Sequence, residues 1–233
     1  QRLKSHMETL EHRDFWKLVQ EADPAGLGIE QTEQTLAHDV TPLLVAYPAL
    51  EVLTIRGSQG LSLTPARYPA LRSLTIESGG MRAAGVRSDN DCDLPALTHL
   101  ELWLGTDNYG GDATVDDLRQ ILTGTRLPRL TTLGLRDAEI ADHVAAAVAG
   151  APVVARLEVL DLSLGMLSDT GAGALLAGQP LTHLRRLDLH HHFLSQPVMD
   201  RLTAELGAAG VELDLSDAGK PGDDDDRYIA VSE

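Results

Sequence analysis

Residues 157–189 read LEVLDLSLGMLSDTGAGALLAGQPLTHLRRLDL, a stretch that contains the pattern L-x-x-L-x-L twice, 27 residues apart. The same pattern recurs along most of the chain, with Ile in the last place of its first two copies. The six copies begin at Leu50, Leu71, Leu97, Leu130, Leu157 and Leu184, and a degraded seventh copy ends in Leu213-Asp214-Leu215. The intervals between the six are 21, 26, 33, 27 and 27 residues. Three apolar positions therefore keep one register six times.

A leucine period of about 20 to 29 residues is typical of leucine-rich repeat solenoids, in which each unit adds one strand to a curved parallel sheet. One unit cannot bury its own apolar face, so the stacked leucines form a continuous core. The sequence therefore predicts an α/β fold of this class, with the sheet on the concave face. The convex segments should be irregular at first, as between residues 79 and 95, and helical from Thr114 onward, where Thr114-x-x-Asp117 forms a capping box.

The N-terminal region should close the first repeat, because a solenoid's end unit needs a polar outer face. Apolar residues at helical spacing predict a cap helix over residues 8–22, and Leu27-Gly28-Ile29 resembles a degenerate first strand. A second helix is expected over residues 35–46. The predicted parts are the N-terminal cap with the degenerate repeat over 1–49, the repeats over 50–217, and an acidic tail over 218–233.

The net charge and the cysteine content limit the kinds of partner and the cellular setting that the chain is expected to have. The net charge of −16 argues against nucleic acid and against an anionic membrane surface, whereas a basic protein or a cation is compatible with it. Cys92 is the only cysteine, which predicts a reducing, cytoplasmic setting. No apolar run approaches the roughly 18 residues that cross a bilayer, and no signal-peptide core is visible.

The end of the chain resembles a known family. Residues 223–233, four aspartates followed by RYIAVSE, and residues 187–195, LDLHHHFLS, are similar to a family of uncharacterised bacterial leucine-rich repeat proteins. The helical repeats resemble those of the ribonuclease-inhibitor-like class. The family resemblance implies a bacterial, cytoplasmic protein that accompanies radical-SAM and ATP-grasp-like proteins in an accessory or scaffolding role. It supplies no catalytic residue.

Carboxylates line the expected concave face. In a strand x-L-x-L-x the leucines point inward, and Asp161, Asp188 and Asp214 then form a column on neighbouring strands about 4.8 Å apart. They repel one another unless a positive charge covers them, and Arg186 on the same face supplies part of it. Three interpretations stay open: a solvated acidic face, a docking site for a basic partner, and a divalent cation site, for which a sheet lacks a tight oxygen cage.

Histidine and aromatic residues add candidates to this face. In His190-His191-His192 the side chains alternate, so at most His190 and His192 share a side, and a structural role or a solvated rim is favoured over a zinc site. Trp103 is expected to stand exposed on the central strand, before a long segment that contains Tyr109. Exposed Trp and Tyr often dominate interface energetics. The alternative is that Trp103 packs locally under that segment.

No nucleophile–base pattern, phosphate-binding glycine loop or metal-ligand spacing is present in the sequence. We therefore expect a non-catalytic scaffold or accessory protein that needs no cofactor or metal and docks another protein, basic or a pathway enzyme, on its concave face. The alternative is a metal-dependent accessory protein or enzyme that uses the Asp/His column. The expected partner-binding residues are Trp103, Tyr109, Arg136, Asp161, Arg186, Asp188, His190 and Asp214.

The tail combines charge with an apolar end. Asp223 to Asp226 should form an exposed link, because like charges do not pack together uncompensated. Residues 228–231, YIAV, are strand-prone. We expect residues 213–215 to form the last strand and residues 228–231 to fold back over the C-terminal edge of the sheet. A free acidic interaction segment is the alternative.

Overall fold

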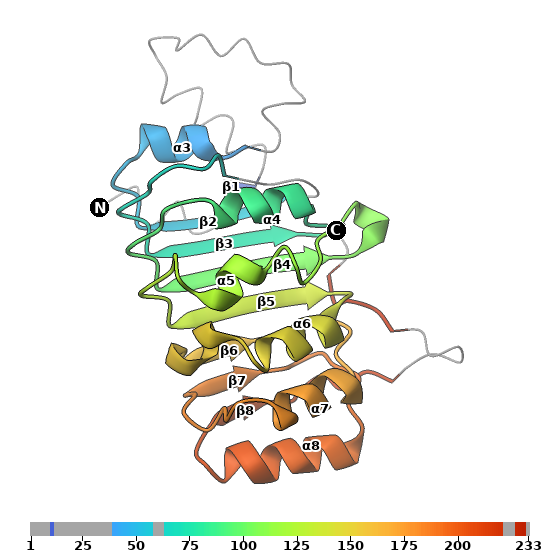
Figure 1. Cartoon of the computed structure of the whole chain (residues 1–233). Coiled ribbons are helices and arrows are strands. Elements are labelled where there is room, and N and C mark those ends of the chain that lie inside the picture. The colour runs from blue at the N-terminus through green and yellow to red at the C-terminus, as the bar shows by residue number, and fades with distance from the viewer. Residues whose placement is uncertain (1–9, 12–38, 58–62, 221–226, 232–233) are drawn as a thin grey trace.

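The copies of L-x-x-L-x-L form parallel strands that pair in chain order in a computed structural model of the chain. The structure describes residues 10–11, 39–57, 63–220 and 227–231. Within them lies an open eight-stranded sheet, an α/β arrangement whose strands all run in one direction (Figure 1). The strands are β1 (Leu10–Glu11), β2 (Val52–Gly57), β3 (Ser73–Ser78), β4 (His99–Gly105), β5 (Thr132–Ala138), β6 (Val159–Asp161), β7 (Arg186–Asp188) and β8 (Glu212–Asp214).

The strand register is the one that the leucine pattern predicts. The fourth position of each copy pairs with its equivalents in the neighbouring strands, so that Leu133, Leu160 and Leu187 stand side by side. All three are fully buried. A shift of one residue would turn this whole row of leucines toward solvent, so burial of one face fixes the pairing.

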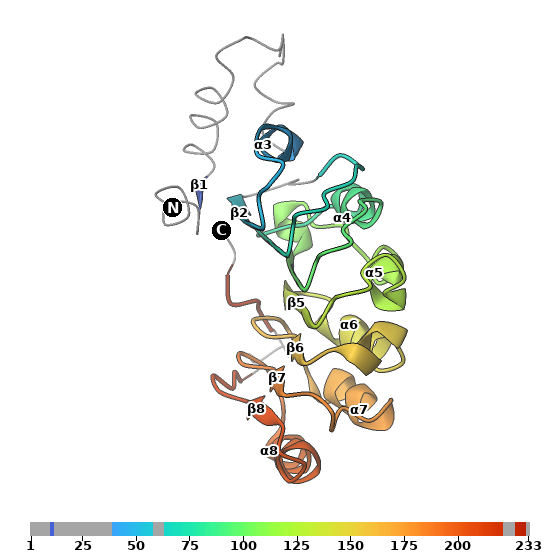
Figure 2. The same ribbon diagram turned by 90° about the vertical axis from the view of Figure 1, so that its left-hand side faces the viewer.

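Helices cover one face of the sheet. In Figure 2 the stack curves with its strands on the inner side and its helices on the outer side, so the inner face carries no helix within the described residues. The α-helices are α3 (Thr41–Ala46), α4 (Ala83–Asn90), α5 (Arg119–Thr123), α6 (Ala141–Val148), α7 (Asp169–Ala177) and α8 (Gln196–Leu202). Shorter helical turns are η1 (Asp107–Tyr109), η2 (Pro152–Arg156) and η3 (Thr203–Gly207).

The outer segments differ in one place from the prediction. Residues 79–95 were expected to be irregular but contain α4, so that expectation is wrong. Contacts from the next repeat support this helix: the Asp112 carboxylate accepts a hydrogen bond from Ala83 N at 2.6 Å, and Arg87 pairs with Asp117 at 2.5 Å. Tertiary contacts thus override a weak local helix propensity.

The N-terminal prediction is wrong at Leu10 and Glu11. These residues form β1, paired in parallel with Ile55 and Arg56, and not the start of a helix. An edge strand exposes unpaired backbone groups, and β1 satisfies part of the free edge of β2. The remaining residues of the predicted cap helix and of the degenerate strand at Leu27–Ile29 lie outside the described residues.

The end of the chain packs elsewhere than predicted. β8 forms as expected, but residues 227–231 do not cover the edge beside it. Instead, Val231 N donates to Asp137 Oδ1 at 3.0 Å, near the end of β5, and Ala230 N donates to Leu164 O at 2.8 Å, in the turn that follows β6. These turns offer free acceptors for the segment's backbone amides. The link at residues 223–226 lies outside the described residues.

Within the described residues, no helix combines the length and the apolar character needed to cross a membrane.

Candidate functional site

An arginine holds two carboxylates together at the centre of the inner face. Arg136 on β5 donates from Nη1 to Glu101 Oε1 at 2.8 Å, and its Nε lies 3.3 Å from Asp161 Oδ2. Gly134 stands between Glu101 and Asp161 in the strand register and has no side chain. A Cβ at that glycine would lie 3.0 Å from the Glu101 Cγ and 3.5 Å from the Arg136 Cδ, so the glycine leaves room for the bridge.

Trp103 is part of this cluster and is buried, so the prediction of an exposed tryptophan is wrong. Only 8% of the residue is accessible. Its indole Nε1 donates to Glu101 Oε1 at 2.8 Å, and the guanidinium carbons of Arg136 and Arg56 lie 5.4 and 5.9 Å from its ring centroid. Cation–π attraction from both arginines, together with a charge-assisted hydrogen bond, fixes the ring against the sheet.

Arg136 favours one of its two carboxylates. Burial opposes ionisation of Glu101, but hydrogen bonds from His99, Trp103 and Arg136 outweigh it and lower the pKa of Glu101 to about 2. Burial raises the pKa of Asp161, although the charge of Arg136 acts to lower it. The shorter distance to Glu101 agrees with this difference, so the Arg136–Glu101 pair is the stronger contact.

A second cluster covers β7 and β8. Arg186 Nη2 lies 2.7 Å from Asp188 Oδ2 and 3.4 Å from Asp214 Oδ2, while its Nη1 donates to Glu212 at 2.7 Å. His190 Nδ1 donates to Asp188 Oδ1 at 2.7 Å. Burial alone would raise the pKa of Asp188, which is 5% accessible, yet Arg186 and His190 lower it. The predicted carboxylate column is therefore compensated by arginine.

The aspartates of the column also share a structural role that sequence reasoning missed. In each, one carboxylate oxygen accepts a hydrogen bond from the backbone N–H two residues later, a turn that Asp and Asn side chains commonly form. These bonds are Ser163 N to Asp161 Oδ1 at 3.0 Å, His190 N to Asp188 Oδ1 at 3.1 Å, and Ser216 N to Asp214 Oδ1 at 3.0 Å. The repeated Asp-x-Ser/His spacing is the signal that could have revealed it.

Two other residues singled out in the sequence, Tyr109 and His192, lie outside the two clusters. Tyr109 lies in η1, in the loop beyond β4, so it belongs to the carboxyl-end edge and not to the two clusters. His192 is fully buried: its Nε2 donates to Leu215 O at 3.1 Å, and its Nδ1 accepts from Leu194 N at 3.1 Å. This is the structural role that the sequence favoured.

One group on the inner face has a geometry that a metal ion could use. Ligand atoms of Asp188, His190 and Asp214 all lie within 4.8 Å of one another. Arg186, however, contacts both of these aspartates, and a divalent cation would have to displace or tolerate its charge.

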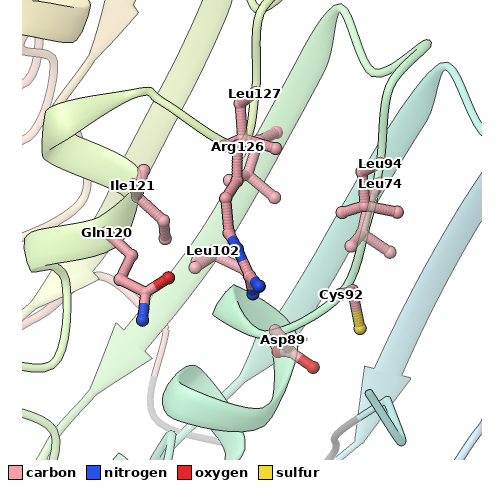
Figure 3. Close-up of a pocket in the computed structure, with 10 residues that line it drawn as sticks. Leu74, Asp89, Cys92, Leu94, Leu102, Gln120, Ile121, Arg126 and Leu127 are labelled. Carbon is pink, nitrogen blue, oxygen red and sulfur yellow. The ribbon is translucent and has the colours of Figure 1, made fainter. Parts of the chain in front are cut away.

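A buried carboxyl group on the helical side was not foreseen. Asp89 lies at a small hollow beneath α4 and α5, where Leu74, Leu102 and Cys92 form part of the wall (Figure 3). Its Oδ1 accepts from Leu63 N at 2.8 Å, and its Oδ2 has no hydrogen-bond partner among the described residues. Burial, reinforced by Asp39, raises the pKa of Asp89 to about 8, so this carboxyl is largely protonated at neutral pH.

Asp89 should make the protein less stable as pH rises. Its folded pKa of about 8 exceeds the ordinary 3.8, so its contribution to stability is full below about pH 4 and is lost as pH rises to 8. The expected loss between pH 6 and 8 is about 2 kcal/mol, at about 1.4 kcal/mol per unit. Urea denaturation at several pH values measures it. Asp89→Asn should remove this slope and the exposed control Asp116→Asn should keep it; identical slopes in both variants would contradict the assignment.

The chain resembles a known protein structure over most of its length. No family model matches the chain, and no curated protein matches it. The chain is similar to a crystal structure of a Bacteroides fragilis protein from structural genomics, with 33% sequence identity and a TM-score of 0.73. The match covers 78% of this chain and 51% of that one, so the chain spans about half the length of its relative. This similarity supports the α/β fold with its parallel sheet.

Proposed function

We propose that the chain is a leucine-rich repeat solenoid that docks a partner protein on the inner face of its sheet, as a non-catalytic scaffold or accessory protein. The repeat register of β2 to β8, one strand to each repeat, supports the solenoid class. The curvature of the stack, with the strands inside, is the geometry by which such proteins present an extended binding surface.

The observation that carries the proposal is the polar strand face that the helices of the described residues leave uncovered. Parallel sheets are usually covered on both faces. Here the inner face of β4 to β8 instead carries arginines and carboxylates held in fixed positions by one another, around Arg136 and Arg186. Side chains that are already ordered lose less conformational entropy on binding, so this face is prepared for a polar contact.

The charge of the chain favours a basic partner or a pathway enzyme with a basic patch. A net charge of −16 steers cations toward the molecule and repels nucleic acid and anionic lipid. At the β8 end of the face, Asp214 and Glu212 are both accessible carboxylates, with 34% and 57% of their side chains exposed. A cytoplasmic location is part of this proposal and rests on the single cysteine, Cys92.

Charge reversal at Asp214 tests the docking face. Asp214→Lys should abolish recovery of a specific partner from the native host, whereas the same change at Asp116, exposed on the helical side, should leave recovery at the wild-type level. Cross-linking mass spectrometry of the recovered complex should place contacts on β4 to β8. Equal recovery by both variants, or cross-links confined to the helices, would reject the inner face as the docking surface.

A metal-dependent role of the Asp188, His190 and Asp214 group is the second candidate, on the strength of its geometry. The compensation by Arg186 makes it the weaker one. Calorimetry with Mg²⁺, Mn²⁺, Ca²⁺ and Zn²⁺ separates the two, because binding that Asp188→Ala abolishes would favour the metal role.

A further inference from the structure

Residues 227–231 lie across the end of β5 and the turns that follow β6 and β7, beside the tips of the strand arrows in Figure 1. Each turn supplies one acceptor or donor to the segment's backbone. His191 Nε2 contacts Tyr228 O at 3.1 Å, Ala230 N donates to Leu164 O at 2.8 Å, and Val231 N donates to Asp137 Oδ1 at 3.0 Å. We call Asp137, Leu164 and His191 the turn row.

The spacing of the turn row matches that of an extended chain. Asp137, Leu164 and His191 are equivalent residues of successive repeats, 27 apart, and all have left-handed backbones with φ of 51°, 68° and 54°. Neighbouring strands are about 4.8 Å apart, so three successive turns span about 10 Å. The step from Tyr228 to Val231 covers about the same length at about 3.3 Å per residue. The repeat therefore places hydrogen-bonding groups at regular intervals along a line that an extended peptide crossing the strands can follow.

Three side chains of the segment meet distinct surfaces. Arg227 Nη1 lies 3.4 Å from Asp142 Oδ2 and donates to Met166 O at 3.1 Å. The Tyr228 ring lies edge-on to the rings of His191 and Phe193, with both centroid distances 5.5 Å. Ile229 is buried, with 6% of it accessible. The turns thus recognise a cation, an aromatic ring and a branched aliphatic side chain in succession.

The turn row also keeps an unused acceptor. Asp137 is fully buried, and its Oδ2 has no hydrogen-bond partner among the described residues. A buried carboxylate oxygen without a donor is costly, so a ligand that brings one more donor would gain stability that residues 227–231 do not supply. Residues 227–231 fill this surface without donating to that oxygen.

We propose that the turn row and its flanking side chains form a peptide-binding site, which residues 227–231 occupy within the same chain and which takes from a partner protein an extended segment of cationic, aromatic and aliphatic residues. Backbone hydrogen bonds supply the affinity and alternate side chains the specificity, as in other modes of extended-peptide recognition. The site lies at the carboxyl ends of the strands and is separate from the docking face proposed above.

Because residues 227–231 already occupy the site, they compete with any free peptide that binds there. A tethered segment acts at an effective concentration of the order of millimolar, so a free peptide binds weakly until the tether is released. Release is achieved in the full chain by Ile229→Asp, which puts a charge at the buried position. Val45→Asp makes the same change from an apolar to a charged side chain on α3, outside the site, where Val45 is exposed.

Fluorescence polarisation with a labelled peptide of residues 227–233, Arg-Tyr-Ile-Ala-Val-Ser-Glu, tests the proposal. The peptide should bind the Ile229→Asp protein at least about tenfold more tightly than the wild type or the Val45→Asp control. A peptide with Glu in place of Arg227, and a scrambled peptide, should not bind. Arg227→Glu in the full chain serves as a second release variant if Ile229→Asp fails to fold.

Three results would overturn the proposal: no peptide binding by a folded release variant, equal binding by all the proteins, or equal binding of the scrambled peptide. A wild-type dimer that becomes monomeric in Ile229→Asp would also overturn it, because the segment would then serve exchange between copies of this chain and not recognition of a partner.

Discussion

Leu160→Ala is expected to lower the free energy of unfolding by roughly 2–5 kcal/mol, the range for a buried leucine truncated to alanine. Leu160 is fully buried and stands between Leu133 and Leu187 in the sheet. The substitution leaves a cavity that both neighbouring repeats share. Equilibrium denaturation gives the loss, and hydrogen exchange should show faster opening of amides in β5 and β7 as well as in β6.

Leu213→Ala is the matched control for Leu160. Leu213 occupies the same register position in the terminal strand β8 and is only half-buried. It has a neighbour on one side only, so its truncation should cost less than that of Leu160. Equal losses, or an unchanged midpoint for Leu160→Ala, would mean that the leucine rows are not the shared core.

The leucine rows could be predicted because their burial depends on a period that the sequence repeats. A shift of one residue in the strand register would turn the apolar side chains of a whole strand toward solvent. The pattern itself therefore specifies β2 to β8. The same reasoning placed Asp161, Asp188 and Asp214 on neighbouring strands of one face, as the structure shows. Periodicity thus locates positions on the sheet accurately.

Periodicity could not predict how side chains on that face pair. Arg56, Trp103 and Arg136 hold equivalent positions of their repeats, but the pattern does not say that both arginines lie over the Trp103 ring, which is buried. The pairing of Leu10 with Ile55 likewise depends on an open strand edge and not on the helical pattern around Leu10. The repeat pattern gives the positions of side chains on the sheet, but not which of them touch.

Arg136→Ala is expected to destabilise the protein by roughly 3 kcal/mol, because it leaves two largely buried carboxylates without their counter-charge. Only 18% of the Arg136 side chain, 14% of Glu101 and 17% of Asp161 are accessible, so water compensates poorly. The substitution also removes one cation from the Trp103 ring. Arg119→Ala breaks an ion pair with Asp116 in which both side chains are mostly exposed, and it should cost less than about 1 kcal/mol.

The pH dependence identifies the pair responsible. The pKa of Glu101 is lowered from 4.5 to about 2, so the stabilisation it provides is present above about pH 4.5 and is lost as pH falls through 2. The difference in unfolding free energy between wild type and Arg136→Ala should therefore shrink as pH falls over that window. Denaturation series at matched pH values measure it. A difference that is the same at pH 3 and pH 7 would show that Arg136 acts through packing against Trp103, and the charge bridge across β4, β5 and β6 would then contribute little to holding the inner face in place.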